Sequence, residues 1–299
     1  MNKFIKGMFA DYGVSKKLFL LLGIFIIMEV FGNVIGLGCG LLDNVVLSHT
    51  NTLRLEQFVA SVIVFIGTPY IFFYLSAKPE CSFSDFFKLD KKNSFGLYFL
   101  AIIALATLIP IVNYTACYNE QITLPESLHF IEEKFKYLED LAKDLTMQLL
   151  KAESPIIFIV NIIVIAAVPA IGEELMFRGA LQKTLQEKMS PICAIVITSV
   201  IFSAMHFQFY GFIPRIILSV FLGLLYYFSG SIKLNMAAHF TNNALAVVAF
   251  YICTLSGIPV DDAPTETMGK EDIYSVIAAT ALFIGIMILI KKKSSDRKF

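Results

Sequence analysis

Ionisable and amide side chains gather at three places in the C-terminal half of the chain, each beside or inside a long apolar run. The three clusters are Glu173, Glu174 and Arg178, then His206, and then His239 with Asn243. A carboxylate and a histidine can hold and deprotonate one water molecule, and a second histidine with a carboxamide can donate hydrogen bonds to an oxyanion. Amide hydrolysis requires these groups, so the set predicts a buried hydrolytic site.

The spacing inside the clusters divides the work among their members. Glu174 and Arg178 are four residues apart, so on a helix they share a face and can pair, which leaves Glu173 free to accept a proton from water. His239 and Asn243 have the same spacing and also share a face. Taken singly, each cluster has a structural alternative: an acid pair at a helix end, a satisfied interior histidine, or polar bonds between neighbouring helices.

The three motifs read EELMFR, FSAMH and HFTNN in this order. They resemble the EExxxR, FxxxH and HxxxN or HxxxD pattern of the CAAX protease and bacteriocin-processing family of intramembrane proteases, which includes the Ras-converting CAAX endopeptidase. The resemblance covers residues 155–252. It implies that Glu173 and His206 activate the water, that His239 and Asn243 stabilise the tetrahedral intermediate, and that Glu174 and Arg178 support them. We expect the substrate to be a membrane-tethered peptide or protein, although the resemblance does not identify it.

Metal chemistry is a separate question, because a catalytic zinc has three protein ligands and one open position. Glu173, His206 and His239 could supply such a set. The sequence has no HExxH motif and no histidine pair four residues apart on a helix. We therefore expect a metal-free, glutamate-type endopeptidase that needs no cofactor, with a zinc endopeptidase as the alternative.

The composition of the chain indicates whether water or lipid surrounds the protein. The chain is 57% hydrophobic and 16% charged, and its mean hydropathy is +0.72, whereas a soluble domain is about 25% charged. These values are typical of an integral membrane protein surrounded by lipids. The formal charge is zero, which removes any bulk electrostatic argument for binding nucleic acid. Five cysteines without metal-type spacing are read as apolar filler.

Long apolar runs predict an all-α, polytopic bundle of about eight transmembrane helices, since a span needs roughly 20 apolar residues. The expected spans are 18–37, 58–77, 95–114, 155–171, 191–207, 212–228, 232–252 and 273–290. Eight crossings return both ends of the chain to one side. Most of the 24 Lys and Arg residues then fall in segments on that side, which predicts that both termini are cytoplasmic. We expect a bacterial plasma membrane.

One expected helix is not a span. Residues 124–151 carry apolar side chains every three or four positions and charged side chains between them, which is typical of an amphipathic helix. It could lie on the outer membrane surface or cap the bundle, or it could act as a lid over the site. The predicted organisation is an N-terminal part at 1–154, a catalytic core at 155–252, and a loop, last helix and basic tail at 253–299.

Two other classes of function use a polar cavity inside a membrane. A transporter could pass protons or ions along these groups, but it should show internal repeats or paired broken helices, and we find no convincing repeat. A non-proteolytic scaffold or immunity protein would keep the site without using it. Both remain alternatives to an endopeptidase at this point.

Overall fold

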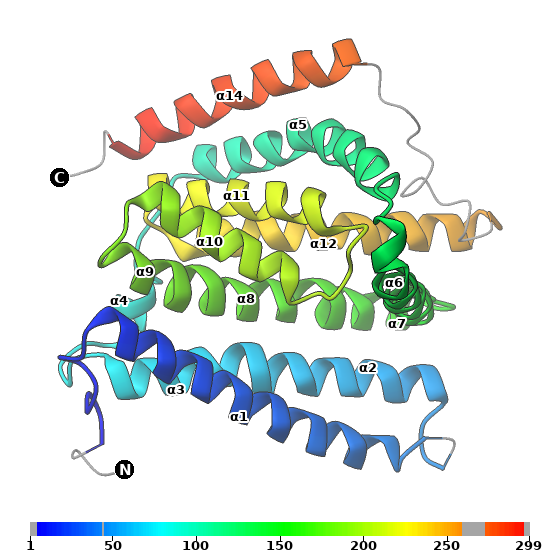
Figure 1. The fold of residues 1–299 in the computed structure, drawn as a ribbon, viewed down its shortest axis with the longest axis horizontal. Coiled ribbons are helices and arrows are strands. Elements are labelled where there is room, and N and C mark those ends of the chain that lie inside the picture. Colours follow the sequence, from blue (N-terminus) through cyan, green and yellow to red (C-terminus); the bar gives the residue numbers. More distant parts are fainter. Residues whose placement is uncertain (1–4, 44, 259–272, 296–299) are drawn as a thin grey trace.

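The computed structural model describes residues 5–43, 45–258 and 273–295, and within these ranges the chain is helical with no β-strand (Figure 1). Most of the long helices run roughly along the long axis of the molecule, whereas α6 (His129–Leu150) lies across it (Figure 1). The predicted all-α bundle is therefore confirmed. Residues 259–272 of the expected external loop and residues 296–299 of the expected basic tail lie outside the described ranges.

Seven helices in the described ranges are long and apolar enough to cross a membrane. They are α1 (Val14–Gly40), the continuous α2, η1 and α3 (His49–Ser76), α5 (Phe95–Glu120), the continuous α7 to α9 (Pro155–Gln186), α11 (Phe212–Ser229), α12 (Ile232–Leu255) and α14 (Ile273–Ser295). The protein is a multi-pass integral membrane protein. The start of α1 and the end of α14 lie at the same end of the bundle in Figure 1.

The expected span 191–207 is shorter than predicted. The helix α10 covers Pro191–Ala204; the Ser190 hydroxyl caps its start by accepting a hydrogen bond from the Cys193 N–H at 3.3 Å. Fourteen residues rise about 21 Å, which is less than the ~30 Å of a bilayer core. The prediction of about eight membrane helices thus holds as seven long helices and one short one. Because α10 ends early, His206 lies in the loop that follows it.

The helices form three layers (Figure 1). On one side α1 lies with α2 and α3, the centre holds α8, α10, α11 and α12, and α5 lies with α14 on the other side. Buried apolar side chains such as Leu105 and Leu222 join α5, α11, α12 and α14. A second buried cluster, with Phe72 and Phe177, joins the first layer to the helices of the centre. Catalytic candidates therefore come from the central layer.

The amphipathic segment forms α6 (His129–Leu150) after a short 3₁₀ turn, η2 (Glu126–Leu128), and it lies across one end of the bundle (Figure 1). Its C-terminal end is held by Arg54 of α2, which is buried and donates to the carbonyls of Leu149 and Lys151. The same guanidinium donates to Asn161 Oδ1 at 2.8 Å. A cation at the last carbonyls of a helix is favourable, so Arg54 anchors α6.

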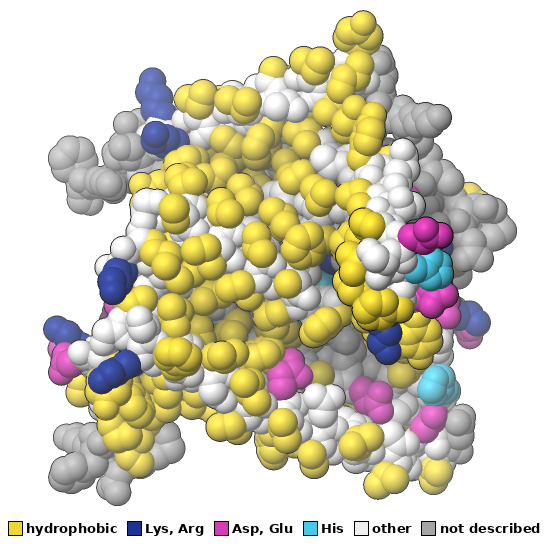
Figure 2. Space-filling view, in the orientation of Figure 1, with side chains coloured by type: hydrophobic (Ala, Val, Ile, Leu, Met, Phe, Trp, Pro, Cys, Tyr) yellow, Lys and Arg dark blue, Asp and Glu magenta, His cyan; other side chains and the backbone are white. Residues whose placement is uncertain are grey.

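The surface agrees with this placement in a membrane. Figure 2 shows hydrophobic side chains across the middle of the molecule and charged side chains mostly at its two ends. An apolar belt between charged ends matches the hydrocarbon layer between two aqueous faces.

A short helix, α4 (Phe83–Phe87), lies between α3 and α5 in the chain. Ser82 caps its start, because the Ser82 hydroxyl accepts a hydrogen bond from the Asp85 N–H at 3.0 Å.

Candidate active site

The helix that carries the first motif changes its winding around the site. It begins as α7 (Pro155–Asn161), becomes a π-helix in η3 (Ile162–Ala167), returns to α8 (Val168–Glu174), widens again in η4 (Leu175–Gln182) and ends as α9 (Lys183–Gln186). Wider π-helical turns occur frequently at functional sites. The two glutamates close α8, and Arg178 lies in η4.

Glycine allows this helix to pack closely beside the glutamates. A Cβ on Gly172 would lie 2.7 Å from Cβ of Phe65 and 3.1 Å from the Phe65 carbonyl carbon. Backbone atoms cannot move aside as a flexible side chain can. Gly172 therefore sets the distance between α8 and η1 (Ser61–Gly67), the π-helical turn that carries Phe65.

Glu174 and Arg178 form a fully buried ion pair. The Arg178 Nη1 donates to Glu174 Oε1 at 2.9 Å, as the four-residue spacing predicts, and both side chains have 0% exposure. Arg178 Nη2 also donates to the carbonyl and the hydroxyl of Ser219 on α11, at 2.9 and 2.8 Å. Breaking a buried pair by removing one partner costs about 3–5 kcal/mol, so this clamp is structural.

His239 joins the two glutamates. Its Nδ1 lies 2.9 Å from Glu174 Oε1, and its Nε2 lies 3.7 Å from Glu173 Oε2. A carboxylate only accepts hydrogen bonds, so Nδ1 carries a proton. The Nε2 atom can donate to a developing oxyanion only when the ring holds its second proton. Asn235, one turn earlier on α12, donates to Glu174 Oε2 at 3.3 Å and completes the shell around that carboxylate.

His206 reaches the cluster from the loop after α10. Its Nδ1 donates to the Phe202 carbonyl at 2.9 Å, which leaves Nε2 as an acceptor. The Phe202 ring lies between the histidines, with centroids 5.0 Å from His206 and 6.1 Å from His239. His206 is exposed on the protein surface and the Glu173 side chain is 14% exposed, whereas Glu174 is fully buried. The two predicted water-activating groups are thus the accessible ones.

Asn243 lies one turn beyond His239 on α12 and is half-buried. Its Oδ1 accepts from Asn242 Nδ2 at 3.2 Å, so the amide N–H groups of Asn243 remain as donors. The structure therefore connects His239 directly with Glu173 and Glu174. His206 packs against Phe202, which also contacts His239, and Asn243 lies one helical turn from His239.

A zinc ion does not fit these side chains as they are arranged. Both histidines have the ring N–H partner that zinc ligands usually have, a carboxylate for His239 and a carbonyl for His206. However, no three His, Cys, Asp or Glu side chains converge at metal-binding distance in the part of the chain that the structure describes. Glu173, His206 and His239 therefore do not present a preformed zinc site.

Three polar residues near the site were not identified from the sequence. Asn235 lies four residues before His239, so the same helical spacing that paired His239 with Asn243 could have found it. Ser219 gives no sequence signal, since its contact with Arg178 joins two distant helices. Arg215 lies in the first turn of α11 and donates to Gln208 Oε1 at 2.8 Å. Gln208 is two residues after His206 in the chain.

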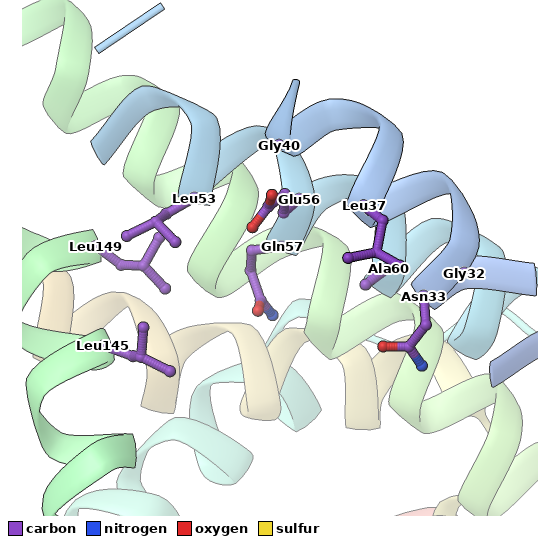
Figure 3. Close-up of a pocket in the computed structure, with 11 residues that line it drawn as sticks. Gly32, Asn33, Leu37, Gly40, Leu53, Glu56, Gln57, Ala60, Leu145 and Leu149 are labelled. Carbon is purple, nitrogen blue, oxygen red and sulfur yellow. The ribbon is translucent and has the colours of Figure 1, made fainter. Parts of the chain in front are cut away.

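Two cavities lie near the end of the bundle where α6 lies. One of about 390 Å³ lies between α1, α2 and α6; Figure 3 shows that Asn33, Glu56 and Gln57 are among its lining residues, and no candidate site residue lines it. The other, of about 630 Å³, is lined by α6, α12 and the loop after His206, including Gln208 and Gly211. No candidate site residue lines the second cavity either, but Gln208 in its wall is two residues after His206 in the chain.

Comparison with known proteins gives one match. The family model described as type II CAAX prenyl endopeptidase Rce1-like matches residues 155–245, which include all three motifs. The match confirms the resemblance expected from those motifs. No curated protein and no solved structure matches the chain.

Proposed function

We propose that this protein, whose residues 155–245 match the model of the type II CAAX prenyl endopeptidase Rce1-like family, is a glutamate-type intramembrane endopeptidase. The family implies a lipid environment and a protein or peptide substrate. The proposal adds a metal-free mechanism and names the catalytic residues. Its main support is the difference between the two glutamates: Glu174 is fully buried in an ion pair, while Glu173 beside it remains partly exposed.

In the proposed reaction, a water molecule lies between Glu173 and His206 Nε2. Glu173 takes a proton as the water oxygen attacks the carbonyl carbon of the scissile bond. His239 Nε2–H and the Asn243 amide donate to the resulting oxyanion. When the C–N bond breaks, Glu173 returns the proton to the leaving nitrogen, so that a carboxylate and an amine are released.

Glu174 acts through His239 in this scheme. Its Oε1 accepts from both Arg178 and His239, which fixes the imidazole with Nε2 turned toward Glu173. Glu174 and Arg178 are therefore positioning residues.

The test uses purified full-length protein in lipid nanodiscs and a library of membrane-tethered peptides. We expect cleavage by the wild type and a loss of about 10²- to 10⁴-fold for Glu173→Gln, the range typical of a general base. Glu56→Gln is the matched control, because it removes a carboxylate from the separate cavity between α1, α2 and α6. Equal cleavage by wild type and Glu173→Gln would contradict the mechanism; ion flux without cleavage would favour a transporter.

The placement of the helices supports the rest of the proposal. The start of α1 and the end of α14 lie at one end of the bundle, which supports both termini on the same side of the membrane (Figure 1). We propose that this side is the cytoplasmic face of a bacterial plasma membrane. The family match begins at residue 155 and lies within the proposed catalytic core at 155–252. Residues 1–154 then supply flanking helices and α6.

A further inference from the structure

Arg215 is a half-buried cation outside all three motifs. It lies in the first turn of α11, which follows the loop that carries His206. Its Nη2 donates to Gln208 Oε1 at 2.8 Å. Its Nη1 is shielded from solvent and has no acceptor among the described residues. Arg178 has a direct carboxylate partner in Glu174, whereas the hydrogen bond of Arg215 goes to a neutral amide.

The environment of Arg215 lacks a direct anionic partner. Buried arginines are normally paired with carboxylates, because an unpaired charge is costly away from water. Arg215 contacts the neutral amide of Gln208 instead, and the carboxylate of Glu139 is joined to it only through that glutamine. An incoming carboxylate would therefore gain both a charge partner and an open hydrogen-bond donor.

The guanidinium is held in place by the loop after His206 and by α6. Gln208 Nε2 donates to Glu139 Oε1 at 3.0 Å, and the Tyr210 N–H donates to Glu139 Oε2 at 3.2 Å. Gly211 leaves room for the arginine, since a Cβ there would lie 2.6 Å from Arg215 Nη2. The chain Glu139, Gln208 and Arg215 thus fixes the cation before any substrate arrives.

A cavity leads to this position. Gln208, Gly211 and Glu139 line the space of about 630 Å³ at the end of the bundle where α6 lies. That volume is within the ~300–1,000 Å³ range of ligand pockets. Arg215 donates to Gln208 and lies against Gly211, two of these lining residues. A peptide segment that extends into the cavity would come close to the guanidinium.

We infer that Arg215 is a specificity-determining residue that binds a carboxylate of the peptide substrate through Nη1, with Nη2 still held by Gln208. The inference rests on the proposed endopeptidase function. The carboxylate could be the C-terminus of the substrate or an acidic side chain near the scissile bond. Either carboxylate would form the same ion pair with Arg215, and a set of peptides distinguishes the two sources.

The experiment compares three versions of one cleavable peptide: a free C-terminal acid, a C-terminal amide, and the amide with one acidic side chain added. A charge-assisted hydrogen bond contributes about 1.5–3 kcal/mol, so we expect the wild type to bind an acid version about 10- to 100-fold tighter than the plain amide. Arg215→Gln should erase this preference mainly through KM. Arg215→Lys should restore part of it, because it keeps the charge and loses the planar fork.

Affinity is also measured by fluorescence with the Glu173→Gln protein in nanodiscs, which needs no turnover. Acid-selective binding that requires Arg215, in a protein that never cleaves, would leave this inference standing and overturn the proposed function. Cleavage by the wild type with equal KM and equal affinity for all three peptides would overturn the inference alone. An equal loss for acid and amide peptides in Arg215→Gln would also overturn it, since that pattern indicates a structural role.

Two further variants protect the test from a folding defect. Gly211→Ala keeps the arginine but pushes its flexible end aside, so it should also abolish the preference for acid peptides while the protein remains folded. Lys136→Gln removes a different cation from the wall of the same cavity and should preserve the preference. Loss of the preference in Lys136→Gln would show that general cavity charge is responsible and would overturn the assignment to Arg215.

Discussion

His239 Nδ1 lies 2.9 Å from Glu174 Oε1, the same oxygen that accepts the Arg178 hydrogen bond. One buried carboxylate therefore fixes both a structural arginine and a histidine of the proposed active site. The adjacent Glu173 has no such direct hydrogen bond and faces His239 Nε2 at 3.7 Å. Two neighbouring glutamates of the same motif consequently serve different purposes.

Glu174→Ala should unfold the protein more readily, whereas Glu173→Ala should not. Removing Glu174 leaves the fully buried Arg178 without its anionic partner, and loss of one member of a buried pair costs about 3–5 kcal/mol. Glu173 is partly exposed and makes no ion pair shorter than 3.7 Å. Thermal unfolding in detergent measures the difference. Equal melting temperatures for the two variants would argue against the clamp.

Asn243→Ala should lower kcat by about 10²- to 10³-fold with little change in folding, as expected for the loss of one oxyanion donor. The control is Asn33→Ala, because the Asn33 amide donates to the Glu29 carbonyl of its own helix, far from the site. Peptide cleavage under saturating substrate measures kcat. A change confined to KM would indicate that Asn243 binds the ground state of the substrate instead.

Gly172→Ala should reduce both stability and activity. The added Cβ would lie 2.7 Å from Cβ of Phe65, and overpacking of this kind typically costs about 1–3 kcal/mol. Because Gly172 precedes Glu173, the displacement also moves the proposed base. Gly285→Ala in α14 is the matched control, since nothing lies within 4 Å of its Cβ. That variant should be neutral or slightly stabilising, because alanine favours helix.

Chelation should leave cleavage unchanged. The candidate ligands Glu173, His206 and His239 do not converge on one point, and the proposed base is a glutamate acting directly on water. The measurement is peptide cleavage together with metal content by mass spectrometry, before and after extended dialysis against a strong chelator. Activity that disappears with the metal and returns only with added zinc would favour the zinc endopeptidase.

The attachment of α6 at its start should weaken at acid pH. Glu132 pairs with Lys136 at 2.9 Å and accepts from the Leu124 N–H at 3.2 Å, and both contacts hold the pKa of Glu132 below its usual range. A carboxyl with a lowered pKa stabilises the folded form above its unfolded pKa of about 4.3, and this contribution is lost as the pH falls through the lower, folded value.

Hydrogen exchange at the Leu124 amide measures this attachment. After correction for the intrinsic rate, protection should be present near neutral pH and should decline once the pH falls below about 4. Glu132→Gln should lack the pH-dependent part. Protection at Leu124 that is independent of pH in both proteins would contradict the assignment to Glu132.

The sequence predicted the pairing of Glu174 with Arg178 and the common face of His239 and Asn243, because helical spacing alone sets both relationships. It also predicted most membrane helices, since long apolar runs have few other stable environments. It extended the span at 191–207 too far. Apolarity continues into Met205, but the helix ends at Ala204, and His206 reaches the cluster from a loop.

The contact between His239 and Glu174 could not be predicted, since it joins two helices 65 positions apart in the chain. The same holds for Ser219 on Arg178 and for the chain from Glu139 through Gln208 to Arg215. The position of α6 over the loop after His206 likewise depends on Arg54 at its far end.

The sequence by itself determined the solvent, the helical class, the family motifs and the residue types available for hydrolysis. These follow from composition and from periodicity within single helices. The tertiary structure alone decided which glutamate is sealed from water, how His239 is oriented, and that the hydrogen bond of Arg215 goes to a neutral amide. Such properties depend on the packing of several helices, and local spacing does not record which helices meet.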